Sequence, residues 1–140
     1  MRKINGLNII LDTHILLFLM NGDERLKRTA LLARIKERAN FGHLYVSPIS
    51  FCELGMLQRE GMVEFSISSA DWVVRALDAP GVRVAPLTID IAVQAESFWD
   101  GKLSMADQII LATAQEMKLS LATLDKPTKR AAQKHRIAFL

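Results

Sequence analysis

The chain has 140 residues, half of them hydrophobic, with 18 basic and 15 acidic side chains and a net charge of +3. This length suits one domain spanning residues 1–140, and the apolar fraction with its mixed charges excludes a disordered chain. The single cysteine, Cys52, excludes an internal disulfide, and the mildly basic balance is compatible with a nucleic-acid partner without indicating one.

Short apolar runs alternate with amphipathic stretches along the first half of the chain. The apolar runs Leu7–Leu11 and Leu44–Val46 predict buried strands. Helices are expected over Thr13–Met20, Glu24–Asn40 and Ser50–Glu60.

The second half continues the alternation. It predicts strands over Val82–Ala85, Leu121–Thr123 and Ile137–Phe139, with helices over Ala70–Ala79, Thr88–Trp99, Met105–Lys118 and Pro127–Gln133. The helix Met105–Lys118 is apolar on nearly all sides, which indicates burial. Strands alternating with helices are typical of a parallel sheet covered on both faces, so we expect a single α/β domain.

A targeting or membrane segment is not expected at the N-terminus. Arg2 and Lys3 precede an apolar stretch, but Asp12 and His14 interrupt it and no small-residue cleavage site follows. The clean apolar run Ile15–Met20 is far shorter than the roughly 20 residues that a membrane span needs. We therefore expect a cytoplasmic protein.

Four acids stand at one predicted edge of the sheet. They follow strands or occupy the first turn of a helix: Asp12, Glu53, Asp107 and Asp125. In open parallel sheets ligands bind beyond the carboxyl ends of the strands, where the strand order reverses. Convergence of these acids is thus an expectation from the βα pattern.

Each acid also has a structural explanation. Ser50 and Glu53 fit a capping box, as do Ser104 and Asp107, while Asp12 and Asp125 could cap the helices that follow them. If all four converge, however, like charges would need a counter-charge. Mg²⁺ or Mn²⁺ suits an all-carboxylate site better than zinc does.

Four segments resemble the motifs of PIN-domain nucleases, especially the VapC toxins of bacterial toxin–antitoxin pairs. They occur in the family's order over almost the whole chain: Leu11–His14, Val46–Leu54, Leu103–Ala114 and Leu121–Asp125. The resemblance implies a three-layer α/β/α domain whose five parallel strands have the order 3-2-1-4-5. Asp90 would then follow the edge strand and only cap its helix.

The resemblance also implies roles for individual residues. Asp12, Glu53, Asp107 and Asp125 would form the acidic site for Mg²⁺ or Mn²⁺, with Thr13 and Thr123 orienting carboxylates or water. Two positions depart from the family pattern: Ser104 stands where an additional aspartate is frequent, and Gln108 where an arginine is common. The Gln108 difference would alter substrate contacts.

The activity implied by the resemblance is that of a metal-dependent endoribonuclease, the toxin of a type II toxin–antitoxin system. We expect in-line attack of water on an RNA phosphodiester, which leaves 5′-phosphate and 3′-hydroxyl ends. The implied partners are RNA, a second copy of the chain in a homodimer, and a VapB-like antitoxin. Ile15–Met20 and the next helix could supply an apolar groove for that antitoxin.

Other residues leave alternatives open. Two basic sets could grip RNA or simply be solvated helix faces: Arg25, Lys27, Arg28, Arg34, Lys36 and Arg38, and Lys126, Lys129, Arg130, Lys134 and Arg136. Cys52 is interpreted as a small buried residue and His14 as packing beside Asp12. Trp72 and Trp99 are interpreted as core or subunit-interface anchors.

Two other functions compete with the nuclease interpretation. A phosphoacceptor receiver domain would need paired acids after the first strand and a lysine after the fifth, which this sequence lacks. A non-catalytic PIN-like module that binds RNA or protein is the other alternative, and Ser104 leaves it open.

Overall fold

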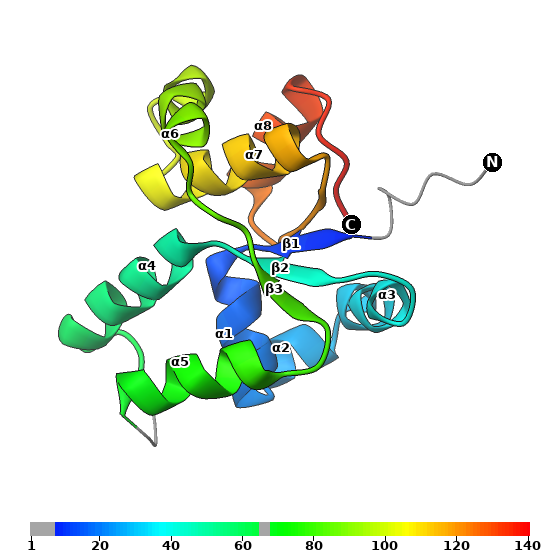
Figure 1. Cartoon of the computed structure of the whole chain (residues 1–140), viewed down its shortest axis with the longest axis vertical. Helices are drawn as coiled ribbons and strands as arrows, with labels where there is room; N and C mark the ends of the chain where they lie inside the picture. The colour runs from blue at the N-terminus through cyan, green and yellow to red at the C-terminus, as the bar shows by residue number, and fades with distance from the viewer. Residues whose placement is uncertain (1–7, 65–67) are drawn as a thin grey trace.

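The computed structural model describes residues 8–64 and 68–140, so Arg2, Lys3 and Leu7 lie outside the described part. Figure 1 shows the elements in chain order: β1 Ile9–Leu11, α1 Thr13–Asn21, α2 Glu24–Lys27, α3 Ala30–Ala39, β2 Leu44–Val46, α4 Pro48–Arg59, α5 Ser69–Asp78, β3 Val82–Val84, α6 Ile89–Ala95, η2 Glu96–Phe98, α7 Met105–Met117, β4 Ser120–Ala122 and α8 Lys126–Lys134.

The sheet is parallel, with the strand order β3-β2-β1-β4. The strand order therefore reverses at β1, which pairs with both β2 and β4. The predicted fifth strand at Ile137–Phe139 is wrong as a strand, because it is reduced to one bridge between Leu121 and Phe139. Arg136, at φ 59°, turns the chain sharply after α8. The segment that follows is joined to β4 by two backbone bonds, Leu121 N to Ala138 O and Leu140 N to Leu121 O.

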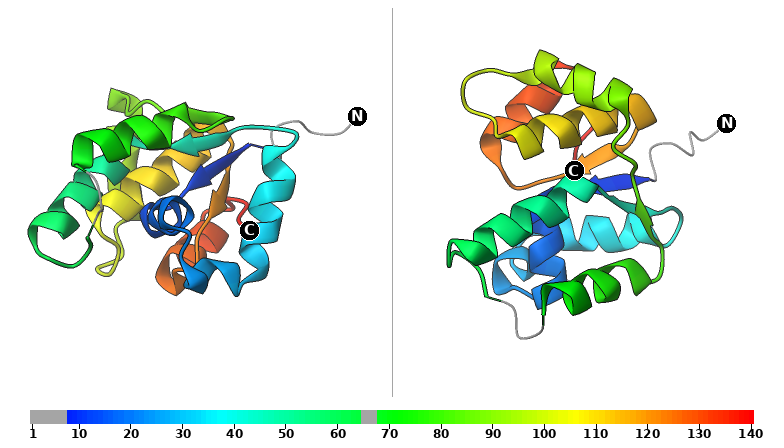
Figure 2. Two further views of the ribbon diagram at one scale, coloured as in Figure 1. Left: turned by 90° about the horizontal axis from the view of Figure 1, so that it is seen from below. Right: turned by 60° about the vertical axis from the view of Figure 1, so that its left-hand side comes forward.

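Helices cover both faces of the sheet, as predicted. Alternate residues of the strands point to opposite faces: Ile10 and Leu121 pack with α6, α7 and α8, whereas Ile9, Leu11 and Ala122 pack with α1 to α5. Figures 1 and 2 show these two helical layers on either side of the strands. The fold is thus the expected three-layer α/β/α arrangement.

The predicted helix Glu24–Asn40 is wrong in one respect, because it is broken into α2 and α3 at Thr29. On one continuous helix Leu26 would point about 140° away from Leu31, five residues later. The extended backbone of Thr29 turns the chain so that Leu26, Leu31 and Ile35 are all buried. The Thr29 hydroxyl donates to the Leu26 carbonyl at 2.7 Å and supports the break.

The predicted start of the next helix at Ser50 is also wrong, because α4 begins at Pro48 and Ser47 is its N-cap. The Ser47 hydroxyl accepts from the Ile49 amide at 3.2 Å, and proline fits the first turn because it has no N–H to satisfy. Ser50 and Glu53 therefore form no capping box, and their side chains are available for other contacts.

Helix α7 is the buried helix that its composition predicts, with eight buried residues between Ala106 and Ala114. It packs against α4, α6 and α8 and brings its first turn to the carboxyl edge of the sheet. Across residues 8–64 and 68–140, no helix combines the length and apolar character that crossing a bilayer requires.

Candidate metal centre

The four acids predicted from the sequence line one pocket at the carboxyl ends of β1 and β4. Its volume is about 230 Å³, and it is lined by Asp12, Thr13, His14, Leu17, Glu53, Leu54, Leu57, Asp107 and Asp125. Four elements supply the acids: Asp12 and Asp125 follow β1 and β4, and Asp107 lies in the first turn of α7. Glu53 lies in the second turn of α4 and not in the first turn as predicted, because that helix begins at Pro48. No lysine or arginine is among these lining residues.

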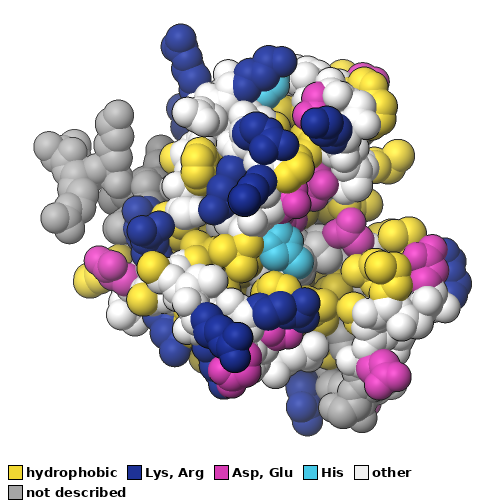
Figure 3. Space-filling view, turned by 180° about the vertical axis from the view of Figure 1, so that it is seen from behind, with side chains coloured by type: hydrophobic (Ala, Val, Ile, Leu, Met, Phe, Trp, Pro, Cys, Tyr) yellow, Lys and Arg dark blue, Asp and Glu magenta, His cyan; other side chains and the backbone are white. Residues whose placement is uncertain are grey.

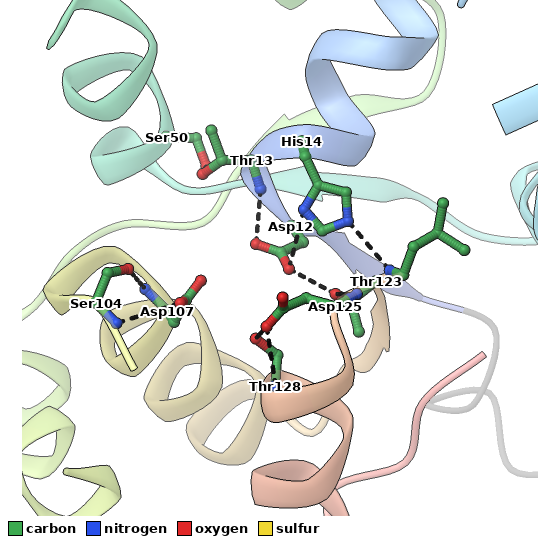
Figure 4. A network of polar contacts seen from close by, with 10 residues as sticks. Asp12, Thr13, His14, Ser50, Ser104, Asp107, Thr123, Asp125 and Thr128 are labelled. Carbon is green, nitrogen blue, oxygen red and sulfur yellow. Dashed lines mark hydrogen bonds and ion pairs between the residues drawn. The ribbon is translucent and has the colours of Figure 1, made fainter. Parts of the chain in front are cut away.

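Asp12 is the most buried of the four acids, with 2% of its surface exposed. Its Oδ1 accepts the backbone N–H of Thr13 at 2.9 Å, and its Oδ2 accepts the Thr123 hydroxyl at 2.6 Å (Figure 4). The hydroxyl oxygen of Thr123 in turn accepts the Asp125 amide at 3.0 Å. Thr123 thus couples the loop after β4 to the carboxylate after β1.

His14 makes a second connection between these two loops. Its Nε2 accepts the Leu124 amide at 3.1 Å, so the neutral ring carries its proton on Nδ1. Nδ1 lies 3.4 Å from Asp12 Oδ2 (Figure 4). The predicted packing of His14 beside Asp12 is therefore present, and the ring also ties the loop after β4 to the start of α1.

Asp125 is the N-cap of α8, as its position in the sequence suggested. Its Oδ2 accepts both the backbone amide of Thr128 at 3.1 Å and the Thr128 hydroxyl at 2.7 Å. Thr128 was missed at the sequence level, although an acid followed three residues later by threonine at a helix start is a recognisable pattern. The other carboxylate oxygen, Oδ1, makes no hydrogen bond with a described residue.

Asp107 combines a structural role with an unfavourable electrostatic position. It forms the predicted capping box: its amide donates to Ser104 Oγ at 3.1 Å and its Oδ2 accepts the Ser104 amide at 3.2 Å. Burial, followed by the charge of Asp12 and then that of Glu53, raises the pKa of Asp107 from 3.8 to about 6, against the opposing hydrogen bonds from Ser104.

Glu53 projects into the pocket from α4 and has no hydrogen bond or ion pair with any described residue. One turn earlier on its helix, the buried Ser50 hydroxyl hydrogen-bonds the Thr13 hydroxyl at 2.9 Å. Thr13 therefore holds α4 against α1 through its side chain, while its backbone amide serves Asp12. The role of Ser50 was missed because the sequence favoured it as a helix cap.

The donor set fits a hard divalent cation in its chemistry. Four carboxylates share a pocket that no cationic side chain lines, and the raised pKa of Asp107 reports the cost of bringing these charges together. As placed, no three His, Cys, Asp or Glu side chains within residues 8–64 and 68–140 are arranged to hold an ion together. Mg²⁺ typically keeps several waters and binds one or two carboxylates directly, which suits such a spacing.

Other residues singled out in the sequence lie elsewhere. Asp90 is exposed in the first turn of α6, and Thr88 rather than Asp90 caps that helix. Gln108 is buried and donates to the Ala95 carbonyl at 3.0 Å, and the effect of this position on substrate contacts stays a prediction. The prediction of a buried Cys52 is wrong, because the residue is exposed and lines a pocket together with Met105 at the start of α7.

Comparison of the sequence with models of known protein families identifies one family. The sequence model of the PIN domain matches residues 9–134, which is nearly the whole chain. The chain belongs to the PIN domain family. The resemblance of its four motifs to this family is therefore confirmed, and PIN domains are generally nucleases. None of the curated proteins matches the chain significantly.

Several solved structures share the fold at low sequence identity. VapBC2 from Rickettsia felis, bound to a DNA fragment from its promoter, is 14% identical over 95% of this chain and 97% of that one, with a TM-score of 0.63. FitAcB from Neisseria gonorrhoeae is 23% identical over 94% and 96%, with a TM-score of 0.55. A toxin–antitoxin complex from Klebsiella pneumoniae is 23% identical over 84% and 86%, with a TM-score of 0.56.

Proposed function

We propose that this PIN domain is a VapC-type toxin that hydrolyses RNA phosphodiesters with Mg²⁺ or Mn²⁺ held by Asp12, Glu53, Asp107 and Asp125. One observation carries the proposal: these four carboxylates line a single pocket without a lysine or arginine among its lining residues. A purely structural set of helix caps would have no reason to gather in one cavity, and Glu53 caps no helix.

A divalent cation would supply Lewis acidity, which neutralises charge on the phosphate and makes water a competent nucleophile near neutral pH. The chain's own contribution is to hold the ligands in place. Asp12 is fixed by the Thr13 amide and the Thr123 hydroxyl, and Asp125 by Thr128. Ligands already fixed in position need not be ordered when the substrate arrives.

Proton occupancy of the pocket also follows from its residues. Because the pKa of Asp107 is about 6, that carboxyl group is protonated in about half of the metal-free molecules at pH 6. A bound cation would favour the ionised form of Asp107, since its positive charge would offset the neighbouring negative charges that oppose this ionisation. In the proposed hydrolysis, water attacks in line and leaves 5′-phosphate and 3′-hydroxyl ends.

Cleavage of a labelled single-stranded RNA tests the proposal. We expect cleavage with Mg²⁺ or Mn²⁺, none with EDTA, and at least a hundredfold loss in Asp12→Asn. Asp90→Asn is the matched control, because it removes the same charge at an exposed position outside the pocket. A parent protein that binds RNA but does not cut it would favour the non-catalytic alternative, and an Asp12→Asn variant as active as the parent would refute the site.

The proposal includes an antitoxin partner, which is supported by the toxin–antitoxin complexes among the similar structures. An apolar groove of about 170 Å³ lies between α1, α2 and α3, where Phe18, Leu19, Leu26 and Leu32 contribute to its lining. Half of the run Ile15–Met20 is not available to a partner, because Ile15, Leu16 and Leu17 are buried in the core. The homodimer and the cytoplasmic location remain parts of this proposal, and sedimentation of the purified chain tests the dimer.

A further inference from the structure

Helix α8 begins at the candidate metal centre and presents a strip of unpaired cations. Thr128, Ala131 and Ala132 face the core. The opposite side carries Lys126, Arg130 and Lys134, four residues apart and therefore in line along the helix, with Lys129 beside them. None of these four side chains forms an ion pair with a described carboxylate.

The basic residues near α2, which the sequence left as an equal alternative, are different. Arg25 Nη2 lies 2.8 Å from Asp23 Oδ2, and its guanidinium covers the ring of Phe18. Lys27 Nζ lies 3.4 Å from Glu24 Oε1. An anion arriving at Arg25 or Lys27 would compete with these carboxylates, whereas the four cations of α8 have no such partner to displace among the described residues.

The strip ends at a small pocket with an exposed aromatic ring. This pocket, of about 110 Å³, is lined by Arg130, Lys134, His135 and Trp99 among others, and Trp99 is 59% exposed. Asp100 also lines it and stays ionised, because the Lys102 and Leu103 amides donate to its carboxylate and lower its pKa, so a phosphate would contact the α8 side of this pocket and not the side of Asp100. Trp72, in contrast, is buried in the core, which is one of the two roles expected for the tryptophans, whereas the exposed Trp99 does not belong to the core.

We infer that α8 is the track along which a single-stranded RNA leaves the metal centre. The phosphates contact Lys126, Lys129, Arg130 and Lys134, and one base stacks on Trp99. From residue 126 to residue 134 the helix rises about 12 Å, so the strip joins the two pockets directly. Figure 3 shows Lys and Arg side chains gathered on the upper part of the molecule, above Asp and Glu side chains near its middle.

A basic groove with an aromatic platform is the combination that binds single strands without reading their sequence. The acidic pocket alone would repel RNA, so a neighbouring cationic surface is needed to hold the substrate over the carboxylates. This inference rests on the proposed function only in taking RNA as the ligand, and it concerns binding rather than cleavage.

The test is the binding of a fluorescein-labelled 12-nucleotide oligouridine in EDTA, followed by fluorescence anisotropy at several salt concentrations. We compare the parent with Lys126→Gln/Arg130→Gln/Lys134→Gln and with the control Arg28→Gln/Arg34→Gln/Arg75→Gln. The control removes the same three charges from exposed positions on the other side of the sheet.

At a slope of about 0.7 per phosphate on single strands, losing three contacts weakens binding about a hundredfold at 0.1 M salt and lowers the salt slope by about 2. Replacement of Trp99 by Ala weakens binding about 5- to 150-fold, whereas Trp99→Phe retains most of the affinity. The control triple variant changes binding less than threefold.

Equal losses in the α8 and control variants would overturn the track, because they would reflect net charge alone. If Trp99→Ala leaves RNA affinity unchanged but alters the sedimenting species, the ring belongs to a subunit interface and the stacking is refuted. This test can fail separately from the proposed function. RNA that binds along α8 but is never cut would contradict the proposed nuclease activity. RNA that is cut by the parent protein, but whose binding does not depend on the α8 cations, would contradict only the RNA track along α8.

Discussion

Asp107 offers a quantitative test of how closely the acids crowd together, because its ionisation is opposed by burial and by Asp12 and Glu53. The folded protein binds this proton more tightly than the unfolded chain does. The carboxyl group therefore stabilises the metal-free fold most below pH 3.8, and this contribution is lost as the pH rises through about 6. Asp107→Asn removes the ionisation and keeps an oxygen acceptor for the Ser104 amide.

A pKa rise from 3.8 to about 6 corresponds to about 3 kcal/mol as an upper limit. Because the side chain is only partly buried, we expect solvent screening to reduce the difference to about 1–2 kcal/mol. In EDTA at pH 7.5, Asp107→Asn should thus be more stable than the parent by that amount, and the difference should vanish near pH 4.

Urea denaturation of parent and variant across pH 4–8 measures this difference, with Asp90→Asn as a control whose effect should stay within about 0.5 kcal/mol. Added Mg²⁺ should stabilise the parent and reverse the order of the two proteins, because only the folded parent binds the ion well. A difference that is independent of pH, or an Asp107→Asn variant less stable than the parent at pH 7.5 in EDTA, would refute the reasoning.

Two further substitutions test local contacts. Thr123→Val removes the hydroxyl that donates to the buried Asp12 carboxylate at 2.6 Å and accepts from the Asp125 amide. We therefore expect it to lower the free energy of unfolding, measured by urea denaturation, by about 2–3 kcal/mol. The control Thr113→Val, which loses only a bond to the Ile109 carbonyl inside α7, should cost about 1 kcal/mol, and equal costs would contradict the special role of Thr123. Ser47→Ala should cost about 1 kcal/mol and speed hydrogen exchange of the Ile49 amide, whereas Ser50→Ala should leave that amide protected. An Ile49 amide that exchanges no faster in Ser47→Ala than in the parent would contradict the cap at Ser47.

The fold was predictable because its determinants are local and repeated. Apolar triplets such as Ile9–Leu11 can be buried on both faces, and each is followed by a capped helix, which specifies βα units and a parallel sheet. The break at Thr29 left one signal in the sequence that the predicted helix did not use: on a continuous helix Leu26 would lie about 140° away from Leu31. The burial of Leu26, Leu31 and Ile35 together depends on tertiary packing in the core.

The candidate site was partly predictable for a related reason. Asp12, Asp107 and Asp125 sit at helix starts, where the sequence shows both their capping role and their place at the sheet edge. The contacts that join separate segments were not visible. Thr13 with Ser50 and His14 with Leu124 depend on how α1, α4 and the loop after β4 pack, which no spacing along the chain reveals.

Direct titration of the metal-free protein with Mn²⁺, followed by electron paramagnetic resonance of the free ion, tests the central claim without any substrate. The account predicts saturable binding by the parent and by Asp90→Asn, and at least tenfold weaker binding by Asp12→Asn and Asp107→Asn. If the parent left all the Mn²⁺ free at millimolar concentration, or if all four proteins bound it equally, the shared carboxylate pocket would not be a metal centre.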